Sequence, residues 1–391
     1  MHCLYPLCFT PIYKQMLWGG GRLSAMYGRG LPYDKTGESW DISCRPGEMG
    51  IIENGPAAGQ TFAEYIAHDK TGVLGSRLAE LERFPLLVKL IDANDKLSVQ
   101  VHPSDEHEKT TTGQWHPSDT GKTEMWYILS PPTCGNLVIG LKQGITPAAL
   151  RAAYENGTVE SCLNRLPVAA GDIVNIPAGL VHALTPGAMV AEVQQNSDIT
   201  YRLYDYNRVG LDGKPRQLHT KEAVAVADFD GKIPKTTVPG LAIDKGDCTQ
   251  TYAIANKYFA ITKYDLHGSF SEISDPAAFS IFTCVEGEVE IISAATLDDH
   301  VSGEATRQVA FAHGGPTVAT HNADVPVHLP AGSSVFIPAG LGSYTLRPKH
   351  GHAVLLKSFV PDIGRDFIAP LLAHGYTTDD IASCTAVDHK R

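Results

Sequence analysis

Four side chains in the first half of the chain have types and spacings that suit metal binding or acid–base chemistry. Gln100 and His102 lie two residues apart at the end of an apolar run, and Lys122 and Glu124 lie two residues apart where another run begins. Residues two apart in a strand point to the same face of a sheet. Each pair is therefore predicted to point together into the interior of a β structure.

A further histidine follows a turn signature. Gly171, Pro177 and Gly179 precede His182 in the pattern G-x5-P-x-G-x2-H. This pattern resembles the second motif of the cupin superfamily, in which a tight turn between strands delivers a histidine into a small β-barrel. A single histidine after a Pro-Gly turn is more often an ordinary structural residue, so the prediction for His182 depends on the residues that accompany it.

The candidate ligands together offer two nitrogens and two oxygens, a mixture that suits Zn²⁺, whereas all-oxygen sets suit Mg²⁺ or Ca²⁺. Taken singly, the amide could be a hydrogen-bonded core residue and the carboxylate could simply pair with Lys122. Four such residues on inward faces favour one metal ion per chain. The set is Gln100, His102, Glu124 and His182.

A third segment, 194–208, alternates in the manner of a strand, so that Asp198, Thr200 and Arg202 would share one face. The carboxylate and the guanidinium could simply form an internal ion pair. Beside a metal, however, they would suit proton transfer next to a carbonyl, since a base takes the proton and cations hold the developing enediolate.

The elements that must position these residues are mostly strands, because short apolar runs bounded by Gly, Pro, Asn or Asp dominate the chain. Helical signals are few, and they fall near 61–83 and 146–166. The runs read as strands are Leu86–Ile91, Leu97–His102, Met125–Leu129, Leu137–Leu141, Ile173–Ile176 and Met189–Val193.

An internal repeat indicates the architecture. The segment Ala170–His182 recurs without a gap as Ala331–Ser343, so that Ser343 stands where the first copy has His182. We therefore expect a mainly β protein with two cupin (jelly-roll) β-barrel modules and a small helical insert or side layer. The expected division is a catalytic module over 1–225, a linker over 226–250 and a degenerate module without a metal site over 251–391.

Composition excludes several classes of partner. Lys and Arg number 32 against 43 Asp and Glu, and this net charge of −11 disfavours nucleic acid and anionic membrane surfaces. The 8 cysteines are scattered without a CxxC pair, which indicates reduced thiols, and the first residues do not resemble a signal peptide or a membrane anchor. A cytoplasmic protein is expected, either a monomer or a homodimer.

At this point the chain resembles the type I mannose-6-phosphate isomerases, particularly their shorter bacterial branch. The similarity spans most of residues 10–210 in the family order, and it is weaker in the C-terminal half. The segments that carry it are Leu17-Trp-Gly-Gly, Glu38-Ser-Trp-Asp-Ile-Ser43, Pro85-Leu-Leu-Val-Lys-Leu-Ile-Asp-Ala, Leu97-Ser-Val-Gln-Val-His-Pro103, Lys122-Thr-Glu-Met-Trp-Tyr127, the turn Gly171–His182 and Ser197-Asp-Ile-Thr-Tyr-Arg202.

The resemblance implies a zinc enzyme that interconverts mannose 6-phosphate and fructose 6-phosphate, with the four residues above as its metal ligands. It also implies that Arg202 is the catalytic arginine, that Lys122 is an active-site lysine, and that Ser98 and Lys96 line the sugar-phosphate pocket. In such a site Lys122 would neutralise the phosphate or assist ring opening. Asp198 is the candidate base, although metal-bound hydroxide or a histidine could serve instead.

Two other functions remain possible from the sequence. One is a dioxygenase-like metal cupin, but that class typically uses three histidines, or two with a carboxylate, and here Gln100 occupies a usual histidine position. The other is a non-catalytic sugar-binding bicupin, which would not need Lys122, Asp198 and Arg202 on inward faces.

Overall fold

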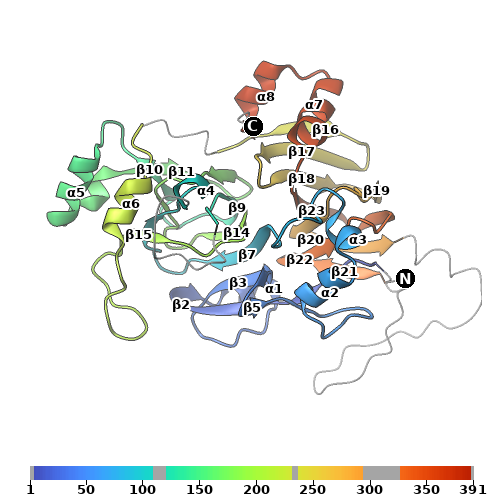
Figure 1. The fold of residues 1–391 in the computed structure, drawn as a ribbon, viewed down its shortest axis with the longest axis horizontal. Helices are drawn as coiled ribbons and strands as arrows, with labels where there is room; N and C mark the ends of the chain where they lie inside the picture. Colours follow the sequence, from blue (N-terminus) through green and yellow to red (C-terminus); the bar gives the residue numbers. More distant parts are fainter. Residues whose placement is uncertain (1–3, 109–119, 231–236, 294–325, 389–391) are drawn as a thin grey trace, which may run out of the picture.

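The structure is a computed structural model that describes residues 4–108, 120–230, 237–293 and 326–388. Two β modules lie beside each other, the N-terminal one carrying α5 and α6 at its outer side and the C-terminal one carrying α7 and α8 (Figure 1). The chain is mainly β, and the prediction of two cupin modules with a small helical side layer is confirmed. Among the described residues, every helix is too short or too polar to cross a bilayer.

The N-terminal module is a sandwich of two antiparallel sheets that enclose an apolar core with Trp126, Ile139 and Leu184 at its centre. One sheet has the order β11 (Leu163–Pro167), β10 (Asn136–Leu141), β13 (His182–Ala183), β8 (Val99–Val101) and β15 (Tyr201–Tyr204). The other has the order β12 (Ile173–Ile176), β9 (Glu124–Ser130), β14 (Met189–Gln195), β7 (Leu86–Asp92), β3 (Thr36–Ile42) and β2 (Ile12–Gly20). Each of the six expected runs contributes a strand, with bounds shifted by at most a few residues.

The C-terminal module is built on two long strands that pair with each other along most of their length, β20 (Ser280–Ser293) and β23 (Ser343–Phe359). Shifts in their register near Cys284 and Gly287 bend the pair, so that one hydrogen-bonded sheet wraps around its own core. The other strands of this sheet are β16 (Leu241–Asp244), β17 (Cys248–Ala255), β18 (Ala260–Leu266), β19 (Phe270–Ile273), β21 (Val327–Pro330), β22 (Ser333–Ile337) and β24 (Ala386–Val387).

The repeated segment folds alike in the two modules. In the first copy β12 is followed by a turn and by β13, which begins at His182. In the second copy β22 is followed by a turn and by β23, which begins at Ser343. The second residue of each copy is a glycine with a positive φ, +90° at Gly171 and +75° at Gly332, a conformation that glycine adopts without strain.

Buried aromatic rings join the modules. Phe62 and Phe84 of the N-terminal half contact Phe336, with ring centroids 5.0 Å and 6.0 Å apart, and Phe84 also lies 5.0 Å from Phe279. The backbone of Leu7 exchanges two hydrogen bonds with that of Phe336. The two halves therefore share one apolar interface, which the burial of large aromatic side chains stabilises.

The helices are short, and they occupy less of the expected segments than predicted. A capping box between Thr61 and Glu64 begins the first of them, but residues 76–83 form turns because Ser76 and Arg77 donate backbone hydrogen bonds to Pro276 and Ala277. In the second segment, residues 163–166 are strand. The helices are α1 (Arg22–Tyr27), α2 (Phe62–His68), α3 (Lys70–Leu74), α4 (Asp105–Glu108), α5 (Pro147–Glu155), α6 (Thr220–Val226), α7 (Ala369–Ala373) and α8 (Thr378–Cys384), with a 3₁₀ turn at Val159–Cys162 and a π-helical turn at Ile363–Ile368.

The expected linker, 226–250, also differs from the structure. Leu241–Asp244 is a strand that pairs with the next one along the chain, and Cys248 already belongs to that next strand. The C-terminal sheet therefore begins before residue 251. Alternation of buried Leu241 and Ile243 with exposed neighbours is the signal that a linker assignment overlooks.

Candidate active site

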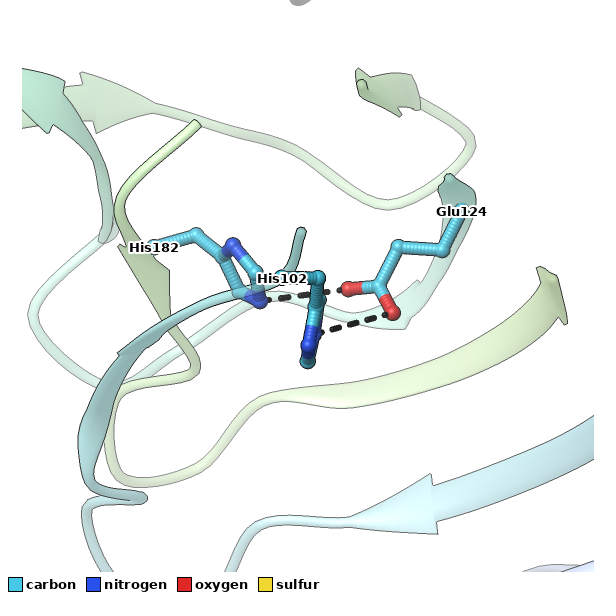
Figure 2. Close-up of side chains that lie close together, drawn as sticks. All are labelled: His102, Glu124 and His182. Atoms are coloured by element: carbon cyan, nitrogen blue, oxygen red, sulfur yellow. Dashed lines mark ion pairs between the residues drawn. The ribbon is translucent and has the colours of Figure 1, made fainter. Parts of the chain in front are cut away.

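Three buried side chains from three strands converge in the N-terminal module (Figure 2). His102 follows β8, Glu124 begins β9 and His182 begins β13. The Nε2 atom of His182 lies 3.3 Å from Oε1 of Glu124, and Nε2 of His102 lies 3.5 Å from Oε2. The potential ligand atoms all lie within 4.8 Å of one another.

Backbone carbonyls orient both imidazoles. The Nδ1 atom of His102 lies 2.7 Å from the carbonyl oxygen of Ile199, and Nδ1 of His182 lies 2.8 Å from that of Leu180. With Nδ1–H donating outward, each Nε2 lone pair points to the centre of the group, which is the arrangement of metal-bound histidines. Burial lowers the pKa of His182 to about 4 and holds the pKa of His102 well below its ordinary value, so both rings are neutral at pH 7.

Glu124 supplies the test of whether these residues fit a metal. Its side chain is fully buried, yet neither carboxylate oxygen makes a hydrogen bond, although Oε2 is ion-paired with Lys122 Nζ at 2.6 Å. Lys122 therefore satisfies Oε2, whereas Oε1 has no donor, and a buried carboxylate oxygen in that state is costly unless a cation or a donor meets it. Two imidazole nitrogens beside such a carboxylate are a donor set that fits Zn²⁺.

Gln100 completes the predicted set. Its side chain reaches the same point from β8, where Nε2 of the amide lies 3.3 Å from Nε2 of His182. Since an amide can present either its nitrogen or its oxygen from one position, Gln100 is placed to offer Oε1 to the centre of the group. Lys122 also lies within this group, with its Nζ 3.3 Å from His102 Nε2.

A cavity of about 320 Å³ opens beside the group. Arg202 lines it, donating through Nε to Ser98 Oγ at 3.3 Å and through Nη1 to the Gln217 carbonyl at 2.8 Å. Asp198 also lines the wall, half exposed, and its enclosure raises the pKa of its carboxyl above the ordinary value, although Lys89 opposes that effect. The cavity therefore brings a candidate base, Asp198, and the cations Arg202 and Lys89 near the three buried candidate ligands.

Comparison with known proteins identifies the group to which this arrangement belongs. Residues 7–134 match the model of the phosphomannose isomerase type I catalytic domain. Mannose-6-phosphate isomerase ManA of Bacillus subtilis is 36% identical over 288 residues, which cover 74% of this chain and 88% of that protein. The chain belongs to the type I phosphomannose isomerase family.

Other members of this family support the assignment and the fold. The mannose-6-phosphate isomerase of Streptococcus mutans is 32% identical over 286 residues, 73% of this chain and 86% of that protein. The crystal structure of the Bacillus subtilis mannose 6-phosphate isomerase superposes with a TM-score of 0.73 at 28% identity, covering 90% of this chain and 99% of that one. A variant of the Salmonella typhimurium phosphomannose isomerase shares the fold, with a TM-score of 0.65 at 17% identity.

Three charged residues of this family member, of which Lys89 and Glu192 are buried, were missed by the sequence reasoning. Lys89 Nζ lies 3.5 Å from Glu38 Oε2 and 3.5 Å from Glu192 Oε1, and all three residues line the cavity. Burial alone would lower the pKa of Lys89, but the two carboxylates raise it above its ordinary value. For Glu192, burial and Glu124 raise the pKa of the carboxyl, and Trp126 Nε1 donates to it at 2.7 Å. The overlooked signal is a charged residue inside an apolar run, Lys89 within Leu86–Ile91 and Glu192 within Met189–Val193.

Two predicted site residues lie differently from the expectation. Lys96 does not line the cavity, because its Nζ lies 3.8 Å over the ring of Tyr206, a position that a cation–π interaction stabilises. Asp198 is not on a strand, since β14 ends at Gln195 and β15 begins at Tyr201. Asp198 nevertheless lines the cavity together with Thr200 and Arg202, the two residues with which it was predicted to share a strand face.

A second group of potential ligands lies on the surface of the C-terminal module. Asp265, His267 and His352 are close enough to hold a cation, but both imidazole side chains are about half exposed, 53% and 44%.

The seven cysteines among the described residues are free thiols, which agrees with the expectation of reduced cysteines.

Proposed function

We propose that the chain is a zinc-dependent isomerase that interconverts mannose 6-phosphate and fructose 6-phosphate by proton transfer through an enediolate. The observation that carries this proposal is the buried carboxylate of Glu124, whose Oε1 has no hydrogen-bond donor, between two inward imidazoles and directly beside a cavity lined by cations and carboxylates. The relatives named mannose-6-phosphate isomerase supply the substrate class. A sugar phosphate is accordingly the expected partner, in the cytoplasm.

The residues that would hold the metal are Gln100, His102, Glu124 and His182. When bound, Zn²⁺ supplies Lewis-acid polarisation of a sugar oxygen. The two imidazoles need no proton removed at neutral pH, because burial already keeps them neutral. They are therefore prepared for a dication before it arrives.

The chain's own cations supply the rest of the charge stabilisation. Arg202 and Arg216 line the cavity wall and complement an anionic substrate, and Arg202 is placed to stabilise the enediolate. Lys122 is buried beside Glu124 rather than at the cavity mouth. Its position favours a role at the reacting carbons, in ring opening, over neutralisation of the phosphate.

The base that moves the proton between the two sugar carbons is a carboxylate of the cavity wall. Asp198 is our candidate, because its raised pKa brings it nearer to the working pH and its half-exposed side chain can reach substrate. Glu192 is the second candidate, since its pKa is raised as well, but its side chain is buried and lies closer to Lys89, at 3.5 Å against 3.9 Å for Asp198. Asp198→Asn should remove the acidic limb of the pH–rate profile while Glu192→Gln retains it; the reverse result would make Glu192 the base.

The function is tested by a coupled assay for fructose 6-phosphate formed from mannose 6-phosphate. Purified protein should show turnover that a chelator abolishes and added zinc restores. Absence of turnover in the zinc-loaded protein would contradict the proposed reaction. Turnover that persists after complete removal of the metal would contradict the zinc dependence alone.

A further inference from the structure

The C-terminal module contains a polar cavity of its own, about 280 Å³ in volume. It is lined by charged, hydroxyl and aromatic side chains, among them Lys357, Glu272, Ser280 and Tyr252. These lining residues lie on strands of the C-terminal sheet, far along the chain from the active site. Since the two modules are copies of one fold, the two cavities are expected to correspond.

Strand register shows the correspondence. Ile176 of the first repeat pairs with Glu124, and Ile337, its counterpart in the second repeat, pairs with Ser280. Ser280 therefore takes the place of Glu124, just as Ser343 takes the place of His182. Two of the proposed metal ligands are replaced by hydroxyl groups in the second module.

The same register places the neighbouring charges. Glu192 pairs with Trp126, two residues beyond Glu124, and Lys357 pairs with Phe282, two residues beyond Ser280. The position of Glu192 is thus occupied by Lys357, and both residues line the cavity of their own module. The C-terminal cavity is the counterpart of the active-site cavity, with the carboxylate of Glu192 replaced by the ammonium group of Lys357.

The C-terminal cavity has a partly buried ion pair on its wall, between Lys357 and Glu272. Glu272 accepts hydrogen bonds from the hydroxyls of Tyr264 at 2.5 Å and Tyr344 at 2.6 Å, and from Lys357 Nζ at 2.9 Å. Burial alone would raise the pKa of the Glu272 carboxyl, but Lys357 and the two hydroxyls lower it below its ordinary value. An ionised carboxylate and an ammonium group therefore face this cavity at neutral pH.

The charge of the cavity argues against an anionic ligand. Arg365 at the mouth is ion-paired with both Asp275 and Asp366, and these three join Glu272 and Lys357 among the lining residues. Three carboxylates thus oppose two cations, and a phosphate group would be repelled. Hydroxyl groups, in contrast, donate to carboxylates and accept from an ammonium group.

From this correspondence we propose that the C-terminal cavity is a metal-independent binding site for a neutral polyhydroxylated molecule of monosaccharide size. Lys357 and Glu272 bind its hydroxyl groups, and Tyr252 and Phe359 supply aromatic walls for its carbon skeleton. This site is separate from the proposed isomerase site. It does not depend on zinc, on phosphate or on the reaction.

The test is saturation-transfer NMR and a titration with D-mannose, D-fructose and D-glucose on the full chain, with and without a chelator. All four tryptophans precede residue 127, and Trp18 and Trp126 line the N-terminal cavity. A sugar that enters the N-terminal cavity should change tryptophan emission, whereas one that enters the C-terminal cavity should not. We expect saturation transfer to at least one neutral hexose, unchanged by the chelator and without a change in emission.

Variants locate the binding. Lys357→Met should weaken it about tenfold or more, the loss expected for a hydrogen bond to a charged group. Lys263→Met is the matched control, because Lys263 follows the cavity-lining Thr262 on β18 and points to the opposite face. If Lys357→Met unfolds the module, Glu272→Gln, which keeps the shape of the side chain, provides the same test.

Three results would overturn the proposal. One is the absence of saturation transfer at hexose concentrations far above that of the protein. Another is equal binding by Lys357→Met, Glu272→Gln and the unmodified chain. The third is a clear preference of this cavity for phosphorylated over neutral sugars. None of these results depends on whether the chain turns over mannose 6-phosphate, so failure of this proposal and failure of the proposed isomerase function are distinguishable.

Discussion

Replacement of Arg202 by alanine tests the proposed reaction at its most demanding step. Two of the five guanidinium N–H groups are bonded within the described residues, through Nε to Ser98 and through Nη1 to the Gln217 carbonyl. These bonds fix the side chain on the cavity wall, and the remaining N–H groups are left for the substrate. Because burial and Arg216 lower the pKa of Arg202 only from a very high value, the guanidinium keeps its charge at neutral pH.

The magnitude follows from what the side chain does in each state. A preorganised donor that meets charge developing in the transition state is worth about 10²–10³ in turnover, or roughly 3–4 kcal/mol. The two structural bonds are partly exposed, and their loss should cost about 1 kcal/mol of folding stability each. Arg202→Ala should therefore fold and keep its metal, lower kcat by about 10²–10³, and change KM modestly.

The assay is steady-state kinetics with mannose 6-phosphate on zinc-loaded protein, with metal content and melting temperature measured on the same sample. Arg165→Ala is the matched control, since Arg165 lies in the same module, 44% exposed and paired with Glu160. Arg202→Lys should recover part of kcat, because it restores the charge without the planar fork. Near-normal kcat with KM raised many-fold would refute the assignment, since Arg202 would then anchor the phosphate of the resting substrate.

Three further outcomes are expected. Elemental analysis of washed protein should give one zinc per chain. The His182→Ala variant should lose this zinc, and the control variant His352→Ala, in the exposed C-terminal cluster, should keep it. Retention of zinc by His182→Ala would contradict the proposed metal site. Burial lowers the pKa of His182 to about 4 and that of His102 well below its ordinary value, so metal affinity should stay constant from pH 7 to about 5 and fall only as the pH approaches 4. Dialysis at stepped pH, with the bound metal measured at each step, tests this. Loss of half the bound metal near pH 6.5, the ordinary pKa of histidine, would contradict it. The Lys122→Ala variant should lower kcat more than it raises KM, because Nζ of Lys122 lies 2.6 Å from Glu124 among the candidate ligands. A change in KM alone would instead place Lys122 at the phosphate of the substrate.

The convergence of the candidate ligands could be predicted because these residues have local signals in the sequence. The two-residue periodicity of strands sets Gln100 and His102 on one side, and the glycine-rich turn fixes where His182 enters the barrel. The repeat then predicts the second module, because a gapless match of turn residues specifies one backbone path twice. Each of these signals lies within a few residues of the side chain that it positions.

Other features depend on contacts between distant segments, and local pattern does not contain them. Residues 76–83 lose their predicted helix to backbone hydrogen bonds with the C-terminal module. The alternating pattern over 194–208 predicts one strand, but the structure has two strands with a break between them. The backbone N–H of Ser197 donates to the carbonyl of Gln195, and β14 ends there. Lys96 lies two residues before Ser98 and was therefore expected to point the same way. Its ammonium group instead lies over the ring of Tyr206, which belongs to a later loop, and so points away from the cavity.

The buried charges beside the active site show why such features matter for function. Lys89 and Glu192 lie opposite each other on neighbouring strands, 3% exposed each, in a region where apolar side chains would pack as well. Removing two charges from water costs several kcal/mol per ion, and replacing a buried pair by apolar residues is often neutral or stabilising. The C-terminal module shows that the fold does not require this pair, because Thr262 and Lys357 occupy the same register positions there. Folding stability therefore does not account for Lys89 and Glu192, whereas the proposed transfer of a proton between two carbons of an anionic sugar would account for them.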